Sequence, residues 1–266
     1  MKPDISEFSY GYAITDDLIR WVGMPISAAP AFPSLLEEGR PGGGYDLRLE
    51  FLGIPLFLQF KLSDHMTTSR TKEFSRGLFR APFYRMHLRP LRHSLQHNLM
   101  LALEMSGNQV FYAAPLFHQA EELNRAYLNH EVVRRSVFIR PSDIGPLPDN
   151  EGHHVSFQAS GEAYLLSEPV VIRILTGEFL ARNLLLRIRE RRVSDELSDN
   201  FWVNLRNRMI GISIELSQGK EVGSLGYDAV LNMHPYQAVA YLARMSYSCE
   251  MFLVNEKLPN AAWNLQ

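Results

Sequence analysis

The chain has 266 residues, of which 46% are hydrophobic and 21% are charged, and its formal net charge is −2 at pH 7. This balance is typical of a globular protein and argues against a disordered chain. The longest apolar run, 51–60, is too short to cross a bilayer, and the first residues lack the apolar core of a signal peptide. Since Cys249 is the one cysteine, an internal disulfide is excluded, and we expect a cytoplasmic protein without a membrane partner.

The first predicted element is a helix over residues 5–22, where apolar side chains recur at helical spacing. Thr15, which is followed by two aspartates, offers an alternative start inside that range. Residues 24–44 are rich in proline, glycine and alanine, and they predict a loop that ends in a glycine turn.

Two strands are predicted next, over 45–51 and 56–62, because both segments alternate apolar and polar residues. The glycine-containing segment between them predicts the turn of a β-hairpin. A tight turn places Asp46 opposite Gln59, and a four-residue loop places Asp46 opposite Lys61. In both registers these three side chains share one face of the sheet, and the apolar residues share the other.

A helix, a strand and a helix follow, over 94–105, 109–116 and 117–128. With the preceding elements, this order predicts an α/β core in layers. Residues 141–152 carry three prolines, two glycines and three acids, and they predict a boundary or a long loop. We therefore expect a core over 1–145 and a second region over 146–266.

The second region is predicted to be helix-rich. Ser167-Glu168-Pro169 has the chemistry of a helix start, and helical patterns run from there to about residue 208. A further helix is predicted over 234–247 and a final strand over 249–254. The pattern leaves open whether this region is a separate domain or packs on the core.

The side chains on the polar face of the hairpin are those that phosphodiester cleavage needs. Asp46 and the carboxamide oxygen of Gln59 can bind a hard cation, and the backbone carbonyl of Phe60 can be a third ligand; Mg²⁺ prefers such oxygen donors, and Mn²⁺ is the alternative ion. The ion would activate a water, while Lys61 would orient that water or stabilise charge on the phosphate. The alternative is a surface salt bridge between Asp46 and Lys61.

The sequence also resembles a known family. Gly44-Tyr45-Asp46, twelve intervening residues and Gln59-Phe60-Lys61 resemble the signature of the PD-(D/E)XK, or restriction-endonuclease-like, nucleases. The pattern is most similar to the Gln-x-Lys version of Mrr-like restriction enzymes, although no proline precedes Asp46. A helix carrying Gln96 and the strand that follows it extend the resemblance over roughly 5–130. The resemblance implies a mixed central sheet flanked by helices.

The family resemblance implies further site residues. A glutamate on the first helix completes many such sites, and Glu7 and Glu38 compete for this position, with Glu37 as a third choice. Gln96 would touch the metal-bound water or the DNA, the alternative being a polar residue on the helix surface. The resemblance also implies a homodimer that cuts both strands of a duplex, or a protein partner in a complex that defends against foreign DNA.

A basic stretch follows the hairpin, with one glutamate against seven cations. These cations are candidates for contacts to the DNA backbone: Arg70, Lys72, Arg76, Arg80, Arg85, Arg89 and Arg92. We therefore expect a metal-dependent DNA endonuclease. The alternative is a non-catalytic subunit that binds nucleic acid or a protein partner on the same fold, because Gln59 stands where most family members have an acid.

Overall fold

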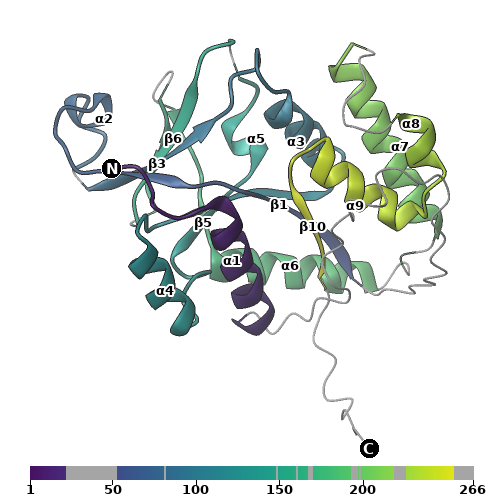
Figure 1. The fold of residues 1–266 in the computed structure, drawn as a ribbon, viewed down its shortest axis with the longest axis horizontal. Coiled ribbons are helices and arrows are strands. Elements are labelled where there is room, and N and C mark those ends of the chain that lie inside the picture. The colour runs from purple at the N-terminus through teal and green to yellow at the C-terminus, as the bar shows by residue number, and fades with distance from the viewer. Residues whose placement is uncertain are drawn as a thin grey trace, which may run out of the picture.

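The computed structural model in Figure 1 describes residues 1–21, 53–80, 82–147, 149–159, 161–166, 170–192, 197, 199–218 and 226–254. The helices in these ranges are α1 (Glu7–Trp21), α2 (Lys72–Ser75), α3 (Gln96–Met105), α4 (Ala120–Leu128), α5 (Pro141–Ile144), α6 (Gly177–Arg192), α7 (Asp199–Leu216), α8 (Tyr227–Leu231) and α9 (Pro235–Met245). The strands are β1 (Ile54–Phe60), β2 (Ser63–Met66), β3 (Phe83–Leu88), β4 (Gln109–Pro115), β5 (Ser136–Ile139), β6 (His153–Phe157), β7 (Ala163–Leu165), β8 (Val170–Val171), β9 (Leu175–Thr176) and β10 (Glu250–Val254).

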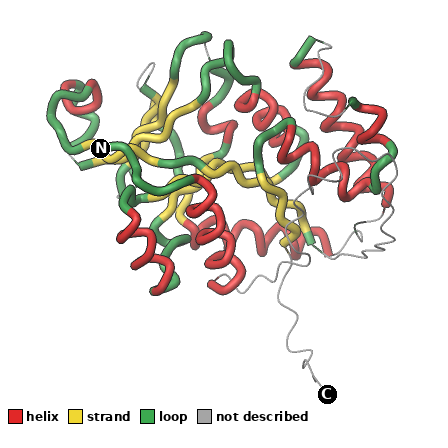
Figure 2. The backbone as a smooth tube through the Cα atoms, in the orientation of Figure 1, coloured by secondary structure: helices red, strands yellow, loops and turns green. Residues whose placement is uncertain are grey.

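The first sheet has the order β10-β1-β4-β5-β9 and is mixed. β1 is parallel to β4 and antiparallel to β10, while β5 is antiparallel to both β4 and β9. The helices α1, α4 and α6 cover one face of this sheet, and α3, α5 and α9 cover the other, as Figures 1 and 2 show. The protein is therefore an α/β protein with a mixed sheet between helices, as the sequence predicts.

Two apolar cores lie on the two faces of the first sheet. Tyr10 and Ile14 of α1 pack with Leu56 and Leu58 of β1 on one face. Phe57 of β1 packs on the other face in a larger cluster that includes residues of α3, α7, α9 and the second sheet. The alternation along β1 was thus predicted correctly, but both faces are buried, because β1 is a central strand of a layered protein.

The hairpin predicted at β1 is wrong in its pairing. Ile54–Leu58 pairs with β10, and Leu56–Phe60 pairs with β4 on the other edge, so both edges of Leu56–Leu58, where the predicted hairpin would begin, are taken. Residues 45–51, Asp46 included, lie outside the described residues. β10 can take this edge of β1 because strands that pair need not be close in the sequence. The apolar run of β10 also fits a position that is buried on both faces.

The second sheet has the order β2-β3-β6-β7-β8 and is antiparallel throughout. β3 falls in the basic stretch and β2 just before it, and no strand was predicted at either place; β6 begins directly after the predicted boundary. These strands are short and mix charged residues with apolar ones, so their sequence lacks a clear alternation. The segment predicted as a loop, 141–152, contains the short helix α5.

Most of the long elements lie where the sequence predicts them. α1 runs through Thr15 without interruption, so the alternative helix start is wrong. The helix and strand predicted over 94–105 and 109–116 are α3 and β4, and Gly107, at φ +97°, provides the left-handed residue that ends the helix. In its described residues, the predicted second region contains α6 to α9, but also the five strands β6 to β10.

The two predicted regions share the first sheet. β10 pairs with β1, β9 pairs with β5, and one buried cluster contains residues of both regions.

Among the helices in the described ranges, none is long and apolar enough to cross a membrane.

Candidate active site

A cleft of about 700 Å³ lies at the carboxyl end of β1. Its walls are one side of α1, the start of α3 and the turn between α9 and β10. The cleft exists because the pairing of β10 with β1 ends at Glu250, opposite Leu58. Before that point the chain turns away, with Ser248 at φ 51° and the Cys249 amide donating to Ala243 O at 2.9 Å.

Three predicted site residues form one buried hydrogen-bonded chain at this cleft. Lys61 Nζ donates to Gln96 Oε1 at 3.2 Å, and Gln96 Nε2 donates to Gln59 Oε1. Gln59 Nε2 in turn donates to the carbonyl oxygen of Phe60 at 3.0 Å. Gln59, Lys61 and Gln96 are 7%, 6% and 4% exposed, so the alternatives that placed Gln96 on the helix surface and Lys61 in a surface salt bridge are wrong. Gln59, Phe60 and Gln96 line the cleft directly.

The position of Gln96 is fixed by its own backbone and by its neighbour His97. The backbone N–H of Gln96 donates to Ser94 Oγ at 3.2 Å. The buried ring of His97 lies 3.0 Å from Tyr112 Oη through Nδ1 and 2.7 Å from the Gly145 carbonyl oxygen through Nε2. These contacts hold the first turn of the helix against β4 and α5. The carboxamide of Gln96 therefore meets β1 in one defined orientation.

The charge of Lys61 is held in an environment with little water. Burial lowers the pKa of the Lys61 ammonium; the carboxylate of Glu7 opposes this shift and the guanidinium of Arg89 adds to it. The ammonium of Lys61 thus has an anionic neighbour, Glu7, and a cationic one, Arg89. Arg89 is exposed and lines the cleft, so it is the cation that can meet an anionic group such as a phosphate there.

Of the candidate acids, the structure places Glu7 at the cleft. Glu7 opens α1, is exposed and lines the cleft together with Gln59 and Gln96. Asp46, Glu37 and Glu38 fall outside the described residues. The structure thus brings Glu7 together with the buried hydrogen-bonded chain, and the competition with Glu38 stays a prediction.

Sequence reasoning missed a carboxylate at this cleft. Glu250, the first residue of β10, lines the cleft and forms an ion pair with Arg244 of α9. Burial raises the pKa of the Glu250 carboxyl, and Arg244 partly offsets this shift. The sequence signal is weak, since a single acid before an apolar strand is usual at a strand start.

The predicted basic residues do not gather at the cleft. Arg89 lines it, but Lys72 lies on α2 at the far end of the second sheet (Figure 1). Arg92 is exposed, and its Nη1 lies 3.9 Å from Glu151 Oε1. The exposed cations in and around α2 form a separate group: Arg70, Lys72, Arg76 and Arg80.

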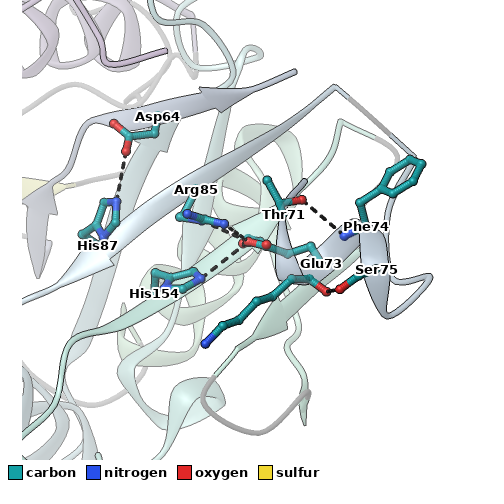
Figure 3. A network of polar contacts seen from close by, with 10 residues as sticks. Asp64, Thr71, Glu73, Phe74, Ser75, Arg85, His87 and His154 are labelled. Carbon is teal, nitrogen blue, oxygen red and sulfur yellow. Dashed lines mark hydrogen bonds and ion pairs between the residues drawn. The ribbon is translucent and has the colours of Figure 1, made fainter. Parts of the chain in front are cut away.

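Arg85 belongs to a buried polar network on the second sheet (Figure 3). Its Nε donates to Glu73 Oε1 at 3.0 Å, and Ser156 Oγ donates to the same oxygen at 2.7 Å. Burial favours the protonated form of Glu73, but the hydrogen bonds from Arg85 and Ser156 outweigh burial and lower the pKa of this carboxyl. Arg85, which was predicted to contact DNA, is thus engaged in an internal ion pair.

The carboxamide and carbonyl oxygen atoms at the cleft are of the types that bind Mg²⁺ or Mn²⁺. Gln59 Oε1 and the Phe60 carbonyl oxygen each accept a hydrogen bond, and a carbonyl oxygen has a second lone pair for a cation. Within the described ranges, however, no three histidine, cysteine, aspartate or glutamate side chains gather as a metal site. The described residues therefore offer neutral oxygen atoms, and a cation site at this cleft would need a carboxylate such as that of Asp46, which lies outside the described residues.

The comparisons with known proteins found no matching family model, no matching curated protein and no matching solved structure.

Proposed function

We propose that the protein is a metal-dependent nuclease with a restriction-endonuclease-like core, which hydrolyses DNA phosphodiester bonds in the cleft beside Gln59. The observation that carries this proposal is the buried chain from Lys61 through Gln96 to Gln59, which ends at a cleft also lined by Glu7. The arrangement of β1 and β4 as parallel neighbours, with α3 on the connection between them, supports the proposal.

Mg²⁺ or Mn²⁺ would be held by the Gln59 carboxamide oxygen, the Phe60 carbonyl oxygen and the carboxylate of Asp46, with Glu7 as a further acid. When bound, such an ion lowers the pKa of a water molecule and neutralises charge on the phosphate. Gln59 is a neutral ligand, so the carboxylates have to supply the negative charge of the site.

Lys61 would act on the phosphate. Its ammonium is oriented by Gln96 Oε1, and burial strengthens its electrostatic effect because little water screens it. A lowered pKa also makes proton donation to the leaving oxygen easier than from an exposed lysine. Gln96 is a positioning residue in this scheme, since it holds both Lys61 and Gln59.

The test is cleavage of plasmid and oligonucleotide substrates in Mg²⁺, in Mn²⁺ and in EDTA. We compare the wild type with Lys61→Met and with Lys2→Met, an exposed lysine that serves as the control. Removal of one group that stabilises the transition state typically lowers the rate about 100- to 1,000-fold. We expect such a loss for Lys61→Met and none for Lys2→Met. Cleavage that persists in EDTA, or equal rates for both variants, would contradict the proposal.

A second candidate function is a non-catalytic subunit that binds nucleic acid or a protein partner. The mutual hydrogen bonds of Gln59, Gln96 and Phe60 favour it, because they satisfy these groups without a metal ion. This candidate predicts no cleavage with either ion and unchanged DNA binding by Lys61→Met beyond the loss of one phosphate contact. The same variants therefore separate the two functions.

A further inference from the structure

α1 carries two apolar stripes, and one of them is exposed. Tyr10, Ile14 and Leu18 are buried against the first sheet. Phe8 and Tyr12, four residues apart and therefore on one side of the helix, are 80% and 62% exposed. Exposed aromatic side chains that stand together on a protein surface often mark a site of interaction.

The exposed stripe of α1 is one wall of the cleft beside Gln59. Phe8, Tyr12 and Ile19 line that cleft, and its other apolar residues come from β1, α9 and β10: Leu58, Phe60, Met245 and Phe252. Gly11 allows this arrangement, because a Cβ atom there would lie 2.7 Å from the ring of Phe60. α1 can thus lie close to β1, with its aromatic side chains at the opening of the cleft.

Polar and charged side chains line the same cleft. Gln59, Gln96 and Arg89 are among them, and the ammonium of Lys61 donates to Gln96. The cleft also contains three acids: Glu250 is paired with Arg244, Asp16 interacts with the hydroxyl of Tyr127, and Glu7 acts on the ammonium of Lys61. An apolar aromatic wall and the exposed cation Arg89 in one cleft match the two halves of a nucleotide, its base and its phosphate.

We propose that this cleft takes a single strand of nucleic acid, with an unpaired base against Phe8 and Tyr12 and the adjoining phosphate at Arg89, beside the pair formed by Lys61 and Gln96. The proposal rests on the proposed function and names its substrate class. A base inside a duplex is stacked on its neighbours, so its faces are not available to these side chains. The cleft volume of about 700 Å³ lies in the range in which proteins enclose small organic groups, roughly 300–1,000 Å³.

The test is fluorescence anisotropy with labelled single-stranded and duplex oligonucleotides. Binding is measured in Ca²⁺ and in EDTA, and gels confirm that the strands stay intact. The variants are Phe8→Ala, Tyr12→Ala and Phe8→Trp, with Phe179→Ala as the control, because Phe179 is exposed on α6 and does not line the cleft. Arms with oligo-dT and oligo-U separate DNA from RNA.

We expect the wild type to bind a single strand more tightly than a duplex. The alanine variants should each weaken single-strand binding by about 5- to 150-fold, the range for loss of one stacked base. Phe8→Trp should bind the single strand about as tightly as the wild type, and Phe179→Ala should leave the affinity unchanged. Thermal unfolding of each variant checks that α1 is still packed.

Equal affinity for single strands and duplexes, or single-strand affinity unchanged in Phe8→Ala and Tyr12→Ala, would overturn the proposal. Competition by a free mononucleotide as strong as by the oligonucleotide would also overturn it, since the site would then hold a small ligand. Binding is measured without turnover, so failure of cleavage in Mg²⁺ refutes the nuclease and leaves the result on single strands to be judged separately.

Discussion

Acidification should destabilise the protein through His154, which lies beside the buried carboxylate of Glu73. The His154 side chain is 23% exposed, and its Nε2 lies 3.5 Å from Glu73 Oε1. Burial and the charge of Arg85 lower the pKa of His154 to about 4 from the ordinary value of 6.5, although Glu73 acts in the opposite direction. We therefore expect the imidazole to be neutral in the folded protein wherever the unfolded chain already carries the proton.

The sign and size follow from proton linkage. Between pH 6.5 and about pH 4 the unfolded chain binds more protons than the folded protein, so the free energy of unfolding decreases as the pH falls through this window. A gap of about 2.5 pH units corresponds to about 3.4 kcal/mol. Because part of the ring is accessible to water, we expect about 2 kcal/mol. Glu73 should stay ionised over most of this window, because its own pKa is lowered.

The assay is urea unfolding from about pH 7.5 to about pH 4.5, followed by circular dichroism, for the wild type, His154→Gln and His87→Gln. His87, whose side chain is 58% exposed, is the control. The wild type and His87→Gln should lose about 2 kcal/mol more than His154→Gln over this range. Parallel pH profiles for the wild type and His154→Gln would refute the reasoning.

Three further predictions concern stability and reactivity. Gly177→Ala should lower the free energy of unfolding by about 1–3 kcal/mol, because the new Cβ would lie 2.3 Å from Val133 Cγ1 and 2.9 Å from its carbonyl oxygen. The control Gly211→Ala, in open space on α7, should not lower the melting temperature. Equal melting temperatures for Gly177→Ala and the wild type would contradict this prediction. Trp202→Ala should cost about 3–5 kcal/mol in urea unfolding, since the ring is 2% exposed, and a loss below about 1 kcal/mol would argue against its burial. Cys249, at 1% exposed and with its thiol pKa raised by burial, should react with a disulfide reagent after unfolding and not before; rapid reaction of the native protein would refute this.

Local patterns in the sequence predicted those features that depend on local physics. The alternation of residues along β1 places Phe57 on one side and Leu56 and Leu58 on the other, as the two buried clusters show. Helical spacing predicted α1 and α3 within two residues at each described end. These features follow from the periods of a strand and a helix, which a single segment already contains.

Contacts between distant segments were not predictable in the same way. The partner of β1 comes from Glu250–Val254, nearly two hundred positions along the chain, and no local feature of either strand specifies the other. Glu250 was missed for this reason, because its place at the cleft follows from that pairing. Gln96 was proposed from the family resemblance, and its burial depends on how α3 packs on β4 and meets the end of β1 through Gln59.

The cleft joins segments that are synthesised at very different times. α1 forms one wall, and the turn between α9 and β10 forms another. The cleft can therefore form only after residues 244–252 have been synthesised, long after residues 7–19. During translation, β1 would have an open edge until β10 leaves the ribosome, and such an edge can pair with other chains. A nascent or prematurely terminated product that lacks β10 would therefore have no closed cleft, and any activity of this site would be withheld until nearly the whole described chain has been made.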